Sequence, residues 1–160
     1  MSIMKAKILI FLLLTTVLFS CRQEPEVNIT NERILVAEEI IYDVIIKTPN
    51  DDPWEVEKLE GYNGNRMIAE LFNAVYTERL KAYEYHSGKR LKPDEVRMAE
   101  LQPGFDRNNI GKIQFTENWY YNAASMEIEK EVVSVVLGYE NRAIDGTLIG
   151  YKAAFRLNLP

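Results

Sequence analysis

The sequence predicts an α+β fold, with an antiparallel β-meander in the C-terminal third and one longer and one short helix packed on the sheet. Residues 113–121 alternate apolar and polar side chains, as a strand with one buried face does. Asp145-Gly146, followed by the apolar run 148–157, is a strong hairpin signal. Residues 65–80 carry apolar side chains at spacings of three and four, which indicates a helix. We expect residues 33–160 to form this single domain.

The domain is expected to begin with a strand. Residues 33–47 are rich in β-branched side chains, which favour a strand, although Ala37-Glu38-Glu39 keeps a helix open as the alternative. The cluster at residues 48–53 contains two prolines and predicts a turn, and Gly61 and Gly64 mark a second break.

The two helices are expected to follow, separated by a short strand. The longer helix, over 65–80, has one apolar face formed by Ile68, Leu71, Phe72 and Val75. A strand is expected over 81–85, and His86-Ser87-Gly88 then turns the chain. Pro93 suits the first turn of the short helix, with Asp94 and Glu95 at its positive end, and this helix should stop near Leu101.

The meander is expected to have three strands. The first contains the alternating residues 113–121, and residues 122–125 can turn. The partner strand runs from Met126 to Tyr139, and the last strand occupies 148–157. Short turns between successive strands imply antiparallel pairing, with the helices covering one face of the sheet.

The N-terminal residues predict export and lipidation. Lys5 and Lys7 precede an apolar run that ends in Leu18-Phe19-Ser20-Cys21, which resembles the lipobox of bacterial lipoproteins, although Phe19 is bulky for that motif. We expect residues 1–20 to be a signal peptide, Cys21 to be lipidated, and residues 21–32 to be a flexible tether. The alternative is an ordinary secretory signal followed by a stray cysteine.

The residue after the cysteine bears on localisation. Arg22 stands where an inner-membrane retention signal often has aspartate, so we expect a lipid anchor in the outer membrane, with the periplasmic face favoured over the cell surface.

Composition excludes several function classes. The net charge of −5 argues against nucleic-acid binding, which needs basic residues to replace phosphate counterions. A single cysteine allows no intrachain disulfide, and one histidine with one cysteine cannot form a zinc site of the usual kind.

No catalytic, metal or cofactor site is expected. His86 lies in a predicted turn and is interpreted as a solvated loop residue. Asp145-Gly146-Thr147 is explained by a hairpin turn, and no pair of carboxylates stands out for acid–base chemistry. Asp51-Asp52 lies between two prolines and is interpreted as a loop, with a contribution to calcium binding as the alternative.

The aromatic run at residues 119–121 has two interpretations. Alternation places Trp119 and Tyr121 on one face of the strand and Tyr120 on the other. The first interpretation is that Trp119 and Tyr121 pack the core. The second is that Tyr120, with Tyr83 or Tyr85, marks a surface that binds a partner or stacks on a sugar.

Two stretches of the chain are similar to a known family. The first contains Ile41-Tyr42-Asp43-Val44, Pro53-Trp54, Leu71-Phe72-Asn73-Ala74-Val75-Tyr76, Ala82-Tyr83 and Leu91-Lys92-Pro93-Asp94-Glu95-Val96, and the second contains Ile113-Gln114-Phe115-Thr116-Glu117-Asn118-Trp119-Tyr120-Tyr121-Asn122, Met126-Glu127-Ile128 and Val133-Ser134-Val135-Val136-Leu137-Gly138-Tyr139. In the identity of their residues and in their order along the chain, these motifs resemble the GldN/PorN family of gliding motility and the type IX secretion system. The resemblance implies a non-enzymatic component of envelope machinery. Members of that family are usually longer, and they join a lipoprotein partner in a ring, whereas here anchor and domain share one chain.

Three functions are therefore weighed. The first is a lipid-anchored assembly or scaffold protein that makes protein–protein contacts with other envelope proteins, such as secretion or gliding ring components. The second is a lipoprotein that captures a glycan or small molecule on exposed aromatic side chains, and an apolar pocket lined by Trp54, Trp119 and tyrosines would support it. The third, a hydrolase with a carboxylate pair, is the least favoured.

Overall fold

The computed structural model of the protein describes residues 33–48 and 53–160. The expected signal peptide, the lipidation site Cys21, the tether and the acidic pair Asp51-Asp52 lie outside the described residues. Within the described ranges, no helix is long and apolar enough to cross a membrane.

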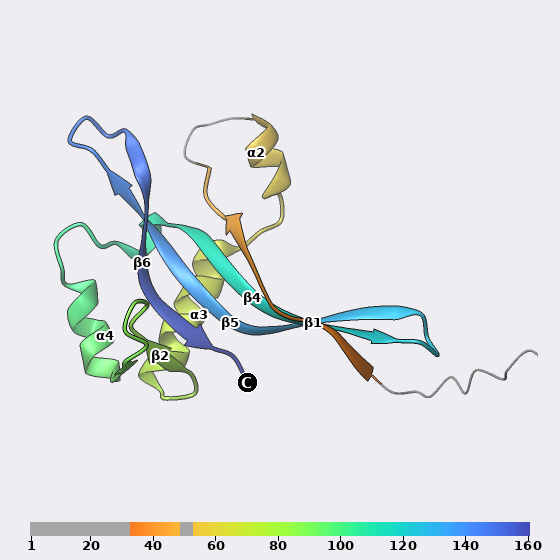
Figure 1. The fold of residues 1–160 in the computed structure, drawn as a ribbon. Helices are drawn as coiled ribbons and strands as arrows, with labels where there is room; N and C mark the ends of the chain where they lie inside the picture. Colours follow the sequence, from red (N-terminus) through yellow and green to blue (C-terminus); the bar gives the residue numbers. More distant parts are fainter. Residues whose placement is uncertain (1–32, 49–52) are drawn as a thin grey trace, which may run out of the picture. The chain divides into compact units, whose positions relative to one another are not determined.

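The domain has a mixed α+β fold built on a six-stranded antiparallel sheet, and its last three strands form the predicted meander (Figure 1). The strands follow the order β1-β4-β5-β6-β2-β3 across the sheet. The elements are β1 (Arg33–Ile45), α2 (Pro53–Lys58), α3 (Gly64–Tyr76), β2 (Lys81–Tyr83), β3 (Arg90–Leu91), α4 (Pro93–Glu100), the 3₁₀ turn η2 (Arg107–Asn109), β4 (Ile110–Asn122), β5 (Glu127–Arg142) and β6 (Leu148–Asn158).

The core lies between α3 and one face of the sheet, which we call the helix-side face. Phe72 of α3 is fully buried, and its ring meets that of Phe155 on β6 edge-on, with the centroids 5.1 Å apart. The expected apolar face of the helix is present. Core residues around Phe72 come from α3, α4 and the central strands: Ile68, Val75, Val96, Ile113, Leu137 and Leu157. Burial of these aliphatic and aromatic side chains is what fixes α3 on the sheet.

The longer helix ends four residues earlier than predicted, at Tyr76 rather than at residue 80. Glu78 adopts a left-handed backbone conformation with φ of +56°, and the Leu80 amide donates to the carbonyl of Ala74. This reversal turns Leu80 back against the core, which explains why its apolar side chain extends the helical pattern beyond the helix.

The short helix begins and ends as expected. Pro93 occupies its first turn, and the Glu95 carboxylate accepts a hydrogen bond from the Lys92 amide at 2.7 Å. Three elements lie outside the predictions, the six-residue helix α2, the two-residue strand β3 and the 3₁₀ turn η2.

The first segment of the domain is a strand, so the helical alternative for residues 37–39 is wrong. β1 pairs antiparallel with β4, but its register shifts between Leu35 and Ala37 and again between Ala37 and Ile40. Glu39 has a φ of +52°, and its amide donates to the Asn118 side-chain oxygen at 3.0 Å. The irregular segment is therefore a β-bulge held by a specific hydrogen bond.

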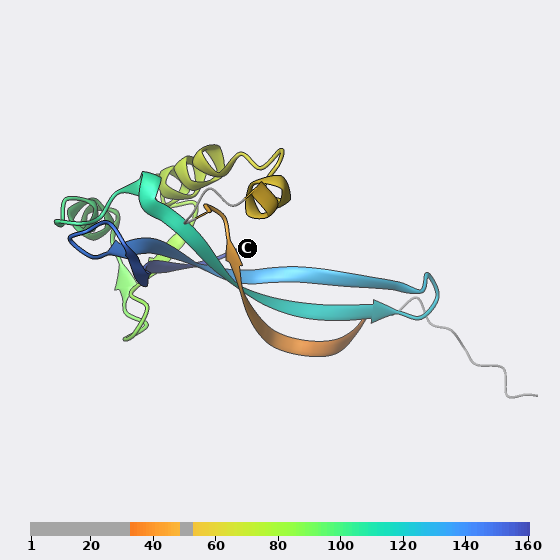
Figure 2. The ribbon, with the colours of Figure 1, turned by 90° about the horizontal axis from the view of Figure 1, so that it is seen from above.

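Part of the sheet continues beyond the helices. We call this part the arm, and define it as β1 residues 33–37, β4 residues 117–122 and β5 residues 127–132, with the turn at 123–126. Both views show the β4–β5 hairpin and the start of β1 running past the end of α3 (Figures 1 and 2). The turn is the one predicted, because the Asn122 side-chain oxygen accepts from the amides of Ala124 and Ser125.

Candidate interaction surface

A buried carboxylate joins the core to the arm. Glu117 on β4 is only 4% exposed and accepts hydrogen bonds from two neutral donors on the helix-side face. The Tyr42 hydroxyl on β1 donates to one oxygen at 2.6 Å, and the Trp119 indole nitrogen donates to the other at 3.0 Å. The hydrogen bond to Glu117 raises the pKa of Tyr42, because ionising the phenol would remove the donor and place two negative charges together.

The interpretation that Trp119 and Tyr121 pack the core is wrong. Both side chains are half-buried, and neither belongs to the core. β4 extends beyond the end of α3, so the apolar face of its last residues lies on the arm rather than under the helix. Trp119 lies under the Lys130 ammonium, which is 4.3 Å from the ring centroid, and the Tyr121 hydroxyl donates to the Met126 sulfur at 3.3 Å.

Tyr120 lies on the opposite face of β4, as the alternation predicts. The Arg33 guanidinium is 3.5 Å from the centroid of its ring, and a hydrogen bond to Glu131 raises the pKa of Tyr120. Arg33 also forms an ion pair with Glu129 at 3.0 Å. This contact ties the start of β1 to β5 across the strand between them.

Tyr83 and Tyr85 do not join Tyr120 in one surface. Tyr83 pairs with Arg156, and the same row of the sheet reaches Gln114 on β4 through β5. Tyr120 is therefore about 20 Å further along β4 at ~3.3 Å per residue. Tyr85 is exposed and its ring meets that of His86, 5.1 Å away.

The arm carries a group of exposed aliphatic side chains. Ile34 pairs with Tyr121, and Tyr121 pairs with Ile128, so the three form one row across the helix-side face. Ile34 is 49% exposed and Ile128 is 63% exposed, and Val36 and Met126 nearby are exposed as well. Contiguous apolar groups on a surface of this kind are typical of contacts with another protein.

The long edge of β1 is a second surface. Among the described residues, no strand pairs with the edge of β1 that faces away from β4. The Ile46 amide donates to the Gly111 carbonyl on β4 at 2.8 Å. Because backbone groups alternate along a strand, those of Ile41, Asp43 and Ile45 point to the open edge. We call residues 40–45 the edge segment.

The carboxylate of Asp43, in the edge segment, is paired with side chains of the neighbouring strand β4. Its carboxylate accepts from Lys112 at 2.9 Å and from Gln114 at 3.0 Å. The hydrogen bond from Lys112 lowers the pKa of Asp43, so the carboxylate is charged but paired at neutral pH.

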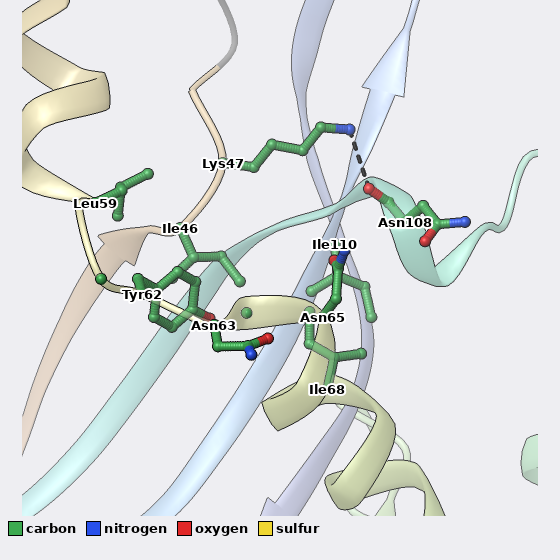
Figure 3. Close-up of a pocket in the computed structure, with 11 residues that line it drawn as sticks. Ile46, Lys47, Leu59, Tyr62, Asn63, Asn65, Ile68, Asn108 and Ile110 are labelled. Atoms are coloured by element: carbon green, nitrogen blue, oxygen red, sulfur yellow. Dashed lines mark hydrogen bonds between the residues drawn. The ribbon is translucent and has the colours of Figure 1, made fainter.

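A cavity of about 670 Å³ lies where the end of β1 meets the start of α3 (Figure 3). Its lining is mixed: Ile46, Lys47, Tyr62, Asn63, Asn65, Ile68, Asn108 and Ile110 contribute to it, and Lys47 spans it to donate to the Asn108 carbonyl at 3.0 Å. Trp54 and Trp119, which would support ligand binding if they lined one apolar pocket, do not come together, because Trp54 is 75% exposed on α2 and Trp119 lies on the arm.

A charged cluster lies at the same end of the sheet. The Glu140 side chain is only 1% exposed, and its carboxylate is 2.8 Å from the Arg142 guanidinium and 3.6 Å from the Lys47 ammonium. The Arg142 hydrogen bond is the main reason that the pKa of Glu140 is lowered. Gly111 makes room for the cluster, since a Cβ there would lie 2.9 Å from the Tyr151 ring.

A second cluster holds the helices together. Arg107 in η2 donates to the carboxylate of Glu100 on α4 and to the Tyr76 hydroxyl on α3. Burial, with the hydrogen bond to Glu100, raises the pKa of Tyr76 to about 12. These contacts join three elements and leave Tyr76 protonated at neutral pH.

The remaining titratable candidates are placed as follows. His86 is exposed in its turn, where its amide donates to Glu84 at 3.1 Å. Asp145 accepts from the Thr147 amide at 2.9 Å and Gly146 has a φ of +86°, which confirms the hairpin turn. Among residues 33–48 and 53–160, no group of three or more His, Cys, Asp or Glu side chains is arranged to hold a metal ion.

Neither a protein-family model nor a curated protein sequence matches the chain.

The sequence contained one indication that Glu117 is buried, although the neighbouring aromatic residues drew attention away from it. Period-two alternation from Ile113 places residue 117 on the apolar face, between Phe115 and Trp119. A carboxylate at an apolar position of a strand indicates a buried polar contact. Its partner Tyr42, 75 residues earlier, has no comparable signal, because pairing between distant strands leaves no local pattern.

Proposed function

We propose that the protein is a non-enzymatic lipoprotein of the outer membrane, anchored through Cys21, that binds other envelope proteins as an assembly or scaffold component. Components of gliding motility and type IX secretion are the partner class that the sequence resemblance suggests. The lipobox-like sequence ending in Cys21 supports the anchor. The apolar arm supports the contact with other proteins.

The arm is the observation that carries the proposal. A row of apolar side chains crosses three strands there, beyond the reach of α3, and ends in the exposed Ile34 and Ile128. Burying an aliphatic side chain contributes about 1.5–3 kcal/mol when it is complete, and roughly half of that for side chains that are already half-buried. A partner that covers the exposed aliphatic side chains of the arm would therefore gain a favourable apolar contribution from each of them.

The test is affinity capture of the tagged chain from native membranes after mild crosslinking. We expect wild-type protein to recover other envelope proteins, and Cys21→Ala to lose them, because confinement to the membrane raises the effective concentration of partners. We expect Ile128→Asp to lose the same proteins while remaining folded, since Ile128 is 63% exposed and outside the core.

Ile144→Asp is the matched control, because Ile144 is fully exposed in the β5–β6 turn, away from the arm. Its capture profile should equal that of the wild type. Recovery of the tagged chain alone, or equal recovery by Ile128→Asp and wild type, would contradict the proposal.

A second function is favoured by the cavity at the α2–α3 junction, whose size of about 670 Å³ lies in the range of small-molecule sites. Lys47, Asn63, Asn65 and Asn108 supply polar groups that suit a glycan or another polar small molecule. Asn65→Leu would then abolish ligand-induced thermal stabilisation in a screen of oligosaccharides, whereas Ile128→Asp would leave it unchanged.

A further inference from the structure

We propose that two copies of the chain pair through the edge segments of β1, antiparallel, with Tyr42 of one copy opposite Tyr42 of the other on a two-fold axis. The pairing would extend the six-stranded sheet of each copy into one continuous twelve-stranded sheet. It is independent of which proteins the arm binds and of lipidation at Cys21.

The edge segment has the properties of a strand that pairs further. It pairs regularly with β4 from Ile40 to Ile45, without the register shifts of the preceding residues. Ile41 is 60% exposed and Ile45 is 37% exposed, although both belong to a six-residue run in which every residue except Asp43 is a strong strand former.

The usual protections against edge pairing are absent from these six residues. Native edge strands are commonly blocked by lysine, proline, bulges or unpaired charge. The edge segment contains neither lysine nor proline, and its single charge, on Asp43, is paired with Lys112. The bulge lies before it, between Leu35 and Ile40, and limits pairing to the edge segment.

The segment is complementary to itself. In a two-fold antiparallel pair centred on Tyr42, Ile40 of one copy faces Val44 of the other on the helix-side face, and Ile41 faces Asp43 on the opposite face. The outward backbone groups of Ile41 and Asp43 then bond to each other reciprocally. Centring on Asp43 would place two carboxylates opposite each other, which disfavours that register.

Charge at the start of the segment supports the antiparallel arrangement. The exposed residues Glu38 and Glu39 precede the segment. The two-fold axis places these acidic residues of the two copies at opposite ends of the pairing. A parallel arrangement would bring like charges together instead.

The test begins with the mass of the protein. Full chain purified from membranes in non-ionic detergent is measured by light scattering, with the detergent contribution subtracted. We expect two chains per particle for the wild type and one for Ile41→Lys, which places a charge at the edge. Ile41→Pro should also give one chain, because the Ile41 amide points away from β4 and its loss leaves the sheet intact.

Ile149→Lys is the control for the charge change. Ile149 is 66% exposed on β6, away from the open edge of β1, so this variant should keep two chains per particle. A wild-type particle with one chain, or a two-chain particle with either Ile41 variant, overturns the proposal.

Oxidative crosslinking tests the register. Directly opposite residues of a non-hydrogen-bonded pair have Cα atoms about 4.5 Å apart, which a disulfide spans. We expect Tyr42→Cys to give a covalent dimer and Ile45→Cys to give none, because two copies of residue 45 would lie about 20 Å apart at ~3.3 Å per residue. Wild-type chain supplies the background from Cys21. A link through Ile45→Cys without one through Tyr42→Cys overturns the Tyr42-centred pairing.

Discussion

Removing the Tyr42 hydroxyl should destabilise the domain more than its position on an edge strand suggests. Tyr42→Phe keeps the ring, which stacks on Phe115 with the centroids 5.5 Å apart, and deletes only the hydroxyl. That hydroxyl donates to Glu117 at 2.6 Å, and Glu117 is 4% exposed. The variant therefore leaves a buried carboxylate oxygen without its donor.

The expected loss follows from the kind of hydrogen bond. A bond to a charged group contributes about 1.5–3 kcal/mol net. Tyr42 is 38% exposed, so water reaches part of the site and replaces some of that contribution. We expect Tyr42→Phe to lower the free energy of unfolding by about 1–2.5 kcal/mol at pH 7. Glu117→Gln removes the negative charge of the acceptor. In that background, Tyr42→Phe should lower the free energy of unfolding by less than in the wild type, with a coupling energy of about 1 kcal/mol.

Urea unfolding followed by circular dichroism measures both values. Tyr121→Phe is the matched control, because its side chain lies on the same face of the sheet but its hydroxyl donates only to the Met126 sulfur, a weak acceptor. This control should cost less than about 0.5 kcal/mol. Equal effects of Tyr42→Phe and Tyr121→Phe, or strict additivity with Glu117→Gln, would refute the reasoning.

Three further predictions concern the charged cluster, its glycine and the anchor. Glu140→Gln should lower the free energy of unfolding by about 1–3 kcal/mol at pH 7. This is less than for a fully buried ion pair, because the Arg142 side chain is 36% exposed to water. Since the folded-state pKa of Glu140 is lowered, its contribution is present above the unfolded pKa and fades as the pH falls, so urea midpoints of variant and wild type should converge in acid. Gly111→Ala should lower the melting temperature because its Cβ would press on the Tyr151 ring, whereas Gly150→Ala, with no atom within 4 Å, should not. Labelled palmitate should enter the wild-type chain and not Cys21→Ala, and labelling of both would contradict the lipobox assignment.

Local patterns predicted the longer elements of the fold but not which of their residues would be buried. The alternation over 113–121 and the Asp145-Gly146 signal predicted the meander, because strand faces and tight turns depend on neighbours in sequence. The period-two alternation also correctly placed Trp119 and Tyr120 on opposite faces of the strand. It did not show that α3 stops short of Trp119, since the length of a covering helix is set by a different part of the chain.

The same limit applies to the candidate surfaces. The pairing of β1 with β4 joins residues about 80 positions apart, and it alone makes residues 40–45 an open edge. The cavity near Tyr62 depends on α2, whose six residues are too few to show a helical period. Tertiary contacts, rather than local propensity, thus decide which apolar residues become surfaces.

The bulge in β1 gives the two proposed contacts separate positions. Regular pairing is interrupted between Leu35 and Ile40, so the arm and the edge segment are not one continuous strand surface. Ile128 also lies on β5, two strands away from the open edge of β1. We therefore expect Ile128→Asp to lose envelope partners but keep two chains per particle, and Ile41→Lys to give one chain but keep those partners. A single variant that abolishes both readouts while its unfolding free energy equals that of the wild type would show that the two surfaces act as one.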